Sequence, residues 1–321
     1  MTNCIHDHAR WGTGDQLGAG HLLTAETTLA ALGSVKEGRI YDLSHVIEMG
    51  APKIEPVQLP YVITSSATAQ NGIKRRRALG AENDAGSNLE RIEMTTHVGT
   101  HIDALGHFTK GDAMYGGRSA DDEVGDWGLE NLGIEHAPSI ITRGVCIDVS
   151  TLDGGEFLEA GRPVTRDDLE RALDRADVGL QPGDVFCLNT GWGRFFMEDN
   201  DRYVGGEPGI EIGAAEWLTS QDVVAICCDN MAIEVLPGTE HPKISMPVHQ
   251  HALVEAGVYL VENLMMDDLV RDAVTNFCFI LLPTKYKGAT GCPVRPVAVI
   301  LAELASRTGD AQSSTTTLPI A

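Results

Sequence analysis

The chain has 321 residues, of which 43% are apolar and 22% are charged, and its formal net charge is −22. This composition is typical of a globular protein with a real core and argues against global disorder. Because an acidic protein repels phosphate backbones and anionic membranes, we expect a small-molecule substrate, with neither nucleic acid nor membrane as a partner.

One compact basic run interrupts the acidic balance, Lys74-Arg75-Arg76-Arg77. The ordinary interpretation is a solvated loop or edge that balances nearby acids. The alternatives are a contact between subunits and a site for an anionic group of a substrate.

The compartment is predicted from what the chain lacks. No stretch reaches the roughly 20 apolar residues that cross a bilayer, and the first residues lack the apolar segment of a secretion signal. Seven cysteines without regular spacing argue against a disulfide framework. We therefore expect a soluble cytoplasmic protein, in which Cys227-Cys228 is buried core and not a redox pair.

Residues 1–37 are expected to form an N-terminal arm. A glycine-rich loop over 11–20 precedes a helix that Thr24 caps and that ends near Gly33. The loop is no phosphate cradle, because it lacks the Lys-Ser/Thr ending and a preceding strand.

The next segment is expected to be rich in strands. Alternating apolar residues predict strands over 40–47, 61–64 and 89–96. The polar segment 65–88 between the last two is predicted to be a flap or loop near the site.

The later chain mixes strands with few helices. A capped amphipathic helix is predicted over 165–173, and strands are predicted over 140–149, 184–190, 223–229, 258–262 and 276–282. Because helices separate only some of these strands, we expect one α/β domain with a mixed sheet over 38–305 and a disordered tail over 306–321.

The strongest functional signal is a group of histidines. Three of the 11 histidines, His97, His101 and His107, lie close together with Asp103. Six extended residues span about 20 Å, whereas ligands lie about 2.0–2.2 Å from a shared ion. We therefore expect a strand end that enters a turn, so that the side chains converge on one point.

His97, His101 and Asp103 offer two imidazoles and one carboxylate. Such a set leaves coordination positions open for water, as in a catalytic metal site. A bound ion lowers the pKa of water and polarises a carbonyl, and His107 suits a general acid/base that protonates the leaving group. The alternatives are that His107 is a further ligand, and that the histidines only satisfy hydrogen bonds in a core or loop.

The pattern His-x-Gly-Thr-His-x-Asp-x-x-x-His-Phe over 97–108 resembles the signature of the cyclase family of metal hydrolases, which includes bacterial kynurenine formamidase and isatin hydrolase. The resemblance covers roughly residues 38–302. It implies a swivelling β/β/α fold, Zn or Mn at His97, His101 and Asp103, His107 as the acid/base, and a homodimer or homotetramer.

The sequence departs from the family pattern at the second metal site, which is found in those members that bind two ions. Those members use a later histidine about a dozen residues before a glutamate. Glu262 is present here, but the twelfth position before it is Gln250, between His249 and His251. Either histidine serves after a small shift, or the segment supports the ligands through hydrogen bonds. We favour a single ion.

Our leading hypothesis is hydrolysis of the carbon–nitrogen bond of a small cyclic or aryl amide by metal-activated water. The alternatives are a lactonase or esterase that uses the same metal site, and a metal-binding protein without catalysis. Trp192 is a candidate for substrate binding in an aromatic pocket, although such residues are more often core.

Overall fold

The structure is a computed structural model that describes residues 10–12, 14–238 and 243–300. The tail predicted over 306–321 lies outside the described residues. Within them, no helix combines the length and apolar character needed to cross a membrane.

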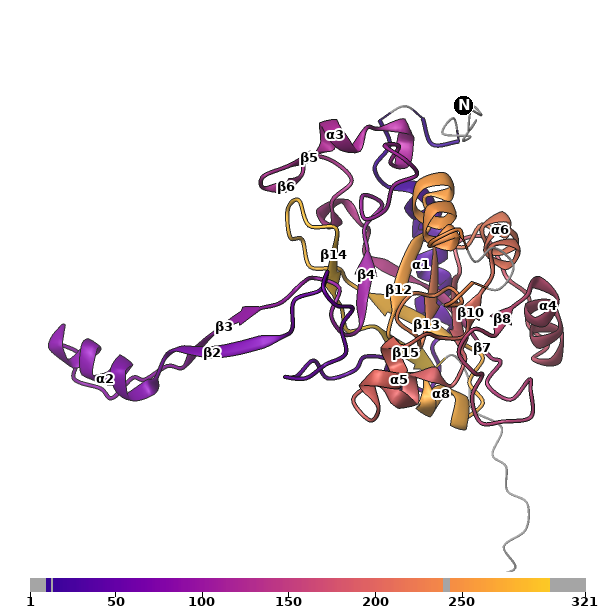
Figure 1. Cartoon of the computed structure of the whole chain (residues 1–321). Coiled ribbons are helices and arrows are strands. Elements are labelled where there is room, and N and C mark those ends of the chain that lie inside the picture. The colour runs from indigo at the N-terminus through magenta and orange to yellow at the C-terminus, as the bar shows by residue number, and fades with distance from the viewer. Residues whose placement is uncertain (1–9, 13, 239–242, 301–321) are drawn as a thin grey trace, which may run out of the picture.

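A nine-stranded mixed sheet forms the centre of the molecule (Figure 1). The strands β7, β9, β11 and β12 run parallel to one another, and antiparallel strands extend the sheet on both sides. This arrangement confirms the predicted α/β class with a mixed sheet. In spatial order the strands are β1 (Ile40–Asp42), β15 (Val297–Ile300), β13 (Asn276–Leu281), β7 (Ile140–Asp148), β9 (Val185–Asn189), β11 (Ala225–Cys228), β12 (Tyr259–Glu262), β4 (His101–Asp103) and β14 (Gly291–Pro293).

The central parallel strands are continuous apolar runs because both faces of the sheet are covered there. Residues 185–188 and 225–228 are fully buried. Cys227 and Cys228 are free thiols in this core, as predicted.

Two predicted helices are present with the expected caps. The side chain of Thr24 accepts a hydrogen bond from the N–H of Thr27 at the start of α1, and that of Thr165 accepts one from Asp168 at the start of α4. The helix α1 packs against β7 and β13, and α4 packs against β7 and α6. The helices are α1 (Ala25–Ser34), α2 (Ala69–Ala78), α3 (Ala120–Glu123), α4 (Arg166–Arg175), α5 (Asn200–Val204), α6 (Ile212–Ser220), α7 (Pro247–His249), the π-helix η5 (Gln250–Ala256) and α8 (Asp267–Arg271).

Short elements complete the fold. Three two-stranded sheets pair β8 (Pro163–Val164) with β10 (Gly209–Ile210), β5 (Val124–Gly125) with β6 (Gly128–Leu129), and β2 (Val62–Ala67) with β3 (Leu89–Glu93). Short 3-10 helices are η1 (Gly18–Leu22), η2 (Tyr115–Gly117), η3 (Ile134–His136) and η4 (Trp192–Phe195). The N-terminal segment lies on the body, where the N–H of Ala19 donates to the carbonyl of Gly257.

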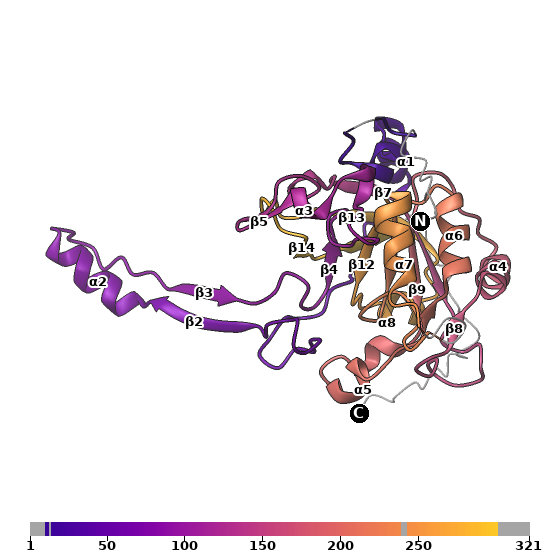
Figure 2. The same cartoon turned by 45° about the horizontal axis from the view of Figure 1, so that its top comes forward.

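Residues 62–93 form a long projection that we call the hairpin arm. The strands β2 and β3 carry α2 at their far end, and the arm extends away from the body in both views (Figures 1 and 2). The prediction of a flap or loop near the site over 65–88 was therefore wrong in two respects. The segment contains a helix, and that helix lies at the tip, remote from the sheet.

Candidate metal centre

The histidine-rich segment lies at one side of the central sheet, on and around β4. This strand is paired with β12 and β14, and the register sets His101 opposite Glu262 and Asp103 opposite Gly291. His97 lies in the turn before the strand, and His107 lies after the turn that follows it. The short strand between two turns is the bent backbone that convergence of these side chains requires.

Glycine makes the first turn sterically feasible. Gly99 has a φ of +70°, and a Cβ at this position would lie 2.6 Å from Cγ1 of Ile47. The left-handed conformation and the close approach together favour glycine over any other residue. The turn brings His97 back toward the end of the strand.

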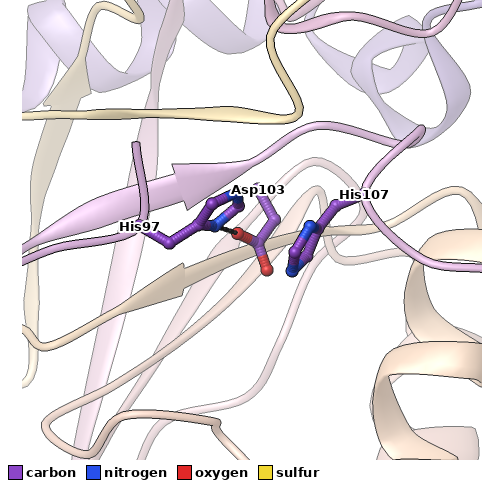
Figure 3. A group of neighbouring side chains, drawn as sticks. All are labelled: His97, Asp103 and His107. Carbon is purple, nitrogen blue, oxygen red and sulfur yellow. Dashed lines mark ion pairs between the residues drawn. The ribbon is translucent and has the colours of Figure 1, made fainter. Parts of the chain in front are cut away.

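The structure brings together all four side chains predicted from the segment 97–107. Nδ1 of His97 lies 2.8 Å, and Nε2 of His101 lies 3.4 Å, from Oδ1 of Asp103. The ring of His107 stacks on that of His97 with 4.0 Å between the centroids. In Figure 3 the carboxylate of Asp103 points into the space between these two rings.

A second pair of side chains joins the cluster from β12 and the end of α7. Glu262 lies 3.2 Å from Nε2 of His101 through Oε2, and 3.1 Å from Nε2 of His249 through Oε1. His249 also approaches Oδ2 of Asp103, at 3.7 Å. The carboxylate of Asp103 therefore faces His97 and His101 through one oxygen and His249 through the other.

The structure distinguishes among the three candidates at 249–251. The side chain of Gln250 donates to the carbonyl of Thr109, and the ring of His251 lies between Thr219 and Glu255. Neither enters the cluster.

His249 precedes Glu262 by 13 residues, and the π-helix η5 follows it directly. A π-helical turn holds more residues than an α-helical turn. The irregular helix therefore accommodates a spacing one residue longer than the dozen that the resemblance implied.

Each of three histidines is held by a partner on the ring nitrogen that does not face Asp103 or Glu262. Nε2 of His97 lies 2.9 Å from Oγ1 of Thr290, and Nδ1 of His101 lies 2.8 Å from the carbonyl of Gly99. Nδ1 of His249 lies 2.7 Å from Oε1 of Glu234. Partners of this kind fix the tautomer and orientation of histidines that bind metal through the other nitrogen.

The sequence did not predict two of these partners, Thr290 and Glu234, of which Glu234 is the buried one. It is 2% exposed, and its carboxylate also accepts hydrogen bonds from the backbone N–H groups of Val248 and His249. The sequence did contain a signal for Glu234, because this charged residue lies between the apolar residues Ile233 and Val235. Such a pattern indicates a buried carboxylate, and a buried carboxylate requires polar partners.

Two observations indicate that the chemistry of these residues fits a divalent cation. Nδ1 of His97 and both carboxylate oxygens of Asp103 are buried without a hydrogen-bond partner among the described residues. Ligands about 2.0–2.2 Å from a common ion lie about 3.0–3.5 Å from one another, and the contacts in the cluster range from 2.8 to 3.7 Å. Close nitrogen–oxygen contacts that are not hydrogen bonds are expected when both atoms point at one ion.

The electrostatics of the cluster favour positive charge. Burial opposes a charge on His101, but the carboxylates of Asp103 and Glu262 raise its pKa to about 10. Burial opposes a charge on His249 as well, and Glu234 and Glu262 raise its pKa to about 10. Burial lowers the pKa of His107 to about 4, against the attraction of Asp103. The buried carboxylates are therefore stable only beside compensating positive charge. Either protonated histidines or a metal ion can supply that charge.

The candidate substrate residue Trp192 lies in a packed aromatic cluster. It is 1% exposed, its indole N–H donates to the carbonyl of Tyr203, and its ring contacts Phe157 and Phe195 edge-on. This placement is that of a core residue, so the prediction that Trp192 contacts substrate is not supported. The ring is satisfied internally and leaves no surface for a ligand.

Known proteins resemble the chain in sequence and in fold. A family model described as "Putative cyclase" matches residues 41–235. Cyclase-like protein 3 of Arabidopsis thaliana is 25% identical over 268 residues, which cover 82% of this chain and 80% of the relative. Kynurenine formamidase of Salinibacter ruber is 24% identical over 216 residues, which cover 67% of this chain and 82% of the relative.

Solved structures show the same architecture. The crystal structure of a novel cyclase is 29% identical with a TM-score of 0.80, covering 92% of this chain and 99% of that one. Isatin hydrolase A from Ralstonia solanacearum is 19% identical with a TM-score of 0.61, covering 86% of this chain and 97% of that one. With a family model that spans more than half of its length, the chain belongs to the cyclase family.

Proposed function

We propose that the protein is a metal-dependent hydrolase that cleaves the carbon–nitrogen bond of a small cyclic or aryl amide. The observation that carries the proposal is the buried carboxylate of Asp103, which belongs to two groups of potential metal ligands, one with His97 and His107 and one with His101 and Glu262. His249 also approaches this carboxylate. The similarity to a relative named kynurenine formamidase, and a fold shared with isatin hydrolase, support the choice of bond.

His97, His101 and Asp103 would hold a divalent ion, Zn or Mn, and Glu262 and His249 would offer ligands for a second one. When bound, such an ion lowers the pKa of water and polarises the carbonyl of the substrate. Thr290, Gly99 and Glu234 orient the three imidazoles toward the carboxylates of Asp103 and Glu262.

Hydrolysis requires a proton to move, and His107 is our candidate for moving it. The water oxygen bonds to the carbonyl carbon, the carbon–nitrogen bond breaks, and the departing nitrogen must receive a proton. No hydrogen bond joins the ring of His107 to another of the described residues, and its neighbour on one face is the ring of His97. We assign to His107 the transfer of a proton from water to the leaving nitrogen.

The direct test compares matched lactams, aryl formamides and lactones as substrates for the purified protein. We expect amide hydrolysis that stops when a chelator removes the ion and that returns when Zn²⁺ or Mn²⁺ is added. His101→Ala should abolish turnover. Amide hydrolysis by a preparation shown to be free of metal would overturn the proposal, and turnover confined to the lactones would replace the amide substrate with an ester.

A further inference from the structure

The residue that follows the candidate ligand Glu262 is a buried asparagine with no role in the proposed mechanism. Asn263 is 2% exposed, and its φ of +56° lies in the left-handed region, which asparagine adopts more readily than most residues with a side chain. Its side-chain nitrogen donates to the carbonyl oxygen of Gly99 at 3.0 Å. A buried amide at the end of β12 therefore holds the loop that precedes β4.

The carbonyl of Gly99 is also the group that orients the ring of His101. Nδ1 of His101 lies 2.8 Å from this oxygen, and Nε2 lies on the side of Asp103 and Glu262. When Nδ1 donates to the carbonyl, Nε2 has a lone pair for an ion. A carbonyl oxygen has two lone pairs, so it accepts from both Asn263 and His101. Asn263 thus fixes the acceptor on which the tautomer of His101 depends.

A second contact joins the same two segments of the chain. The hydroxyl of Thr100 donates to the backbone carbonyl of Asn263 at 2.6 Å, and it accepts the backbone N–H of His45 at 2.9 Å. Asn263 therefore binds the loop before β4 at two adjacent residues, through its side chain at Gly99 and through its main chain at Thr100. Two hydrogen bonds at neighbouring residues restrict both the position and the rotation of the loop.

Tyr203 on α5 determines which way the amide of Asn263 points. Its hydroxyl donates to Oδ1 of Asn263 at 2.7 Å and lies farther, at 3.2 Å, from the carbonyl oxygen of Asp229. A hydroxyl has one hydrogen, and the shorter contact is the one to Asn263. With Oδ1 held by this donor, the nitrogen of the amide faces Gly99. The reversed amide would place two acceptors against each other at Gly99.

Tyr203 is held in turn by the aromatic cluster that contains Trp192. The indole N–H of Trp192 donates to the backbone carbonyl of Tyr203, and the two side chains are 1% and 0% exposed. Solvent therefore does not compete for these hydrogen bonds. From the cluster, the hydroxyl of Tyr203 leads to Asn263, the amide of Asn263 leads to Gly99, and the carbonyl of Gly99 leads to the ring of His101.

We propose that Asn263 and Tyr203 are positioning residues for His101, and that they raise the affinity of the centre for its ion through the carbonyl of Gly99. Asn263 holds the acceptor of the Nδ1 proton, and Tyr203 keeps Asn263 in the orientation that does so. Without them the loop and the ring must be ordered when the ion binds, and this ordering costs affinity. The inference rests on the proposed function, because it takes the cluster to be a metal centre.

The test is a titration of the purified full-length chain with Co²⁺, whose visible absorption reports the geometry of its ligands. Competition with a chromophoric chelator gives the affinity. Asn263→Gly removes the amide and suits the positive φ. We expect this variant to bind Co²⁺ about tenfold more weakly or worse, with a changed absorption spectrum. Tyr203→Phe removes one oxygen atom and should lower the affinity by a smaller factor.

Tyr259→Phe is the matched control for the loss of a buried hydroxyl. The side chain of Tyr259 is 1% exposed, and its hydroxyl donates to the carbonyl of Leu17, away from the cluster. We expect both tyrosine variants to lose thermal stability, measured on the metal-free proteins. Only Tyr203→Phe should also lose affinity for Co²⁺. A purely structural role of Tyr203 predicts wild-type affinity in both variants, and that result would overturn the proposal.

The double variant tests whether the two residues act in series. If Tyr203 acts through Asn263, Tyr203→Phe should cause no further loss of Co²⁺ affinity in a chain that already carries Asn263→Gly. Additive losses would overturn the proposal, and so would a wild-type affinity and spectrum in Asn263→Gly. If Asn263→Gly does not fold, the comparison of Tyr203→Phe with Tyr259→Phe decides.

The wild-type titration separates this proposal from the proposed function. A wild-type chain that binds no Co²⁺ would overturn the metal centre, and the positioning role with it. A wild-type chain that binds Co²⁺, with variants that bind it equally well, would overturn the positioning role alone.

Discussion

Nδ1 of His249 lies 2.7 Å from Oε1 of Glu234, and both side chains are buried. The same carboxylate oxygen accepts the backbone N–H of His249 at 3.1 Å. Glu234 thus holds both the main chain and the ring of His249, and it leaves Nε2 directed at Glu262 and Asp103. Under our proposal, the carboxylate would act on a bound ion through His249 and not by direct contact.

Glu234→Gln should weaken metal binding without unfolding the protein. The amide is nearly isosteric, but it removes the charge that fixes the tautomer of His249, and losses of about 10–100-fold in metal affinity are typical for such partners. A competition titration with a chromophoric chelator measures the affinity for Zn²⁺. Glu170→Gln, on the exposed face of α4, is the control. Equal Zn²⁺ affinity in both variants would show that Glu234 does not support metal binding.

His249→Ala and His251→Ala test which histidine belongs to the site. The ring of His249 contacts Glu262, whereas the ring of His251, two residues later, lies between Thr219 and Glu255. We expect the first substitution to reduce the metal content or affinity and the second to leave both unchanged. Elemental analysis of the two purified variants checks this. The reverse pattern would show that the helix has another register.

His107→Ala should separate catalysis from metal binding. If His107 transfers protons, kcat should fall about 10²–10⁴-fold while the number of ions per chain stays the same. His136→Ala, at a partly exposed histidine outside the cluster, controls for the loss of an imidazole. A loss of bound metal from His107→Ala would instead make this residue a ligand, which is the alternative that its position beside Asp103 leaves open.

Gly291→Ala should perturb His97 through sterics alone. A Cβ at Gly291 would lie 2.7 Å from Cε1 of His97 and 2.7 Å from the carbonyl oxygen of Ile102. Overpacking of this kind costs about 1–3 kcal/mol in the free energy of unfolding, and the displaced ring should also lower metal affinity. Thermal and denaturant unfolding measure the cost. Gly33→Ala in α1, where nothing lies within 4 Å of the added Cβ, should be neutral or stabilising.

Four residues of the candidate site could be predicted because they lie in one short segment of the sequence. His97, His101, Asp103 and His107 are so close in sequence that only a bend was needed to make them converge, and Gly99 supplies it. The distant part was not predictable in the same way. A regular α-helix and a π-helix after residue 249 direct different side chains toward Glu262. The number of residues before Glu262 therefore did not show whether His249 or His251 enters the site.

The arm shows a second limit of sequence patterns. Helices were predicted from apolar periodicity, and α2 buries only Gly72, so it has no apolar stripe to detect. Its residues are nevertheless good helix formers, with Ala, Gln, Lys and Arg prominent. Intrinsic propensity was therefore the usable signal. The central strands had the opposite property, since burial on both faces made them plain apolar runs.

The most direct test of the account is the number of divalent ions per chain in the wild-type protein and in Asp103→Asn, measured by elemental analysis after incubation with Zn²⁺ or Mn²⁺ and removal of free metal. Both oxygens of Asp103 are buried, have no hydrogen-bond partner among the residues that the structure describes, and face histidines on two sides. We predict at least one ion per wild-type chain and a folded variant that has lost it. A wild-type chain that binds no ion, or a variant that keeps the full complement, would contradict the account.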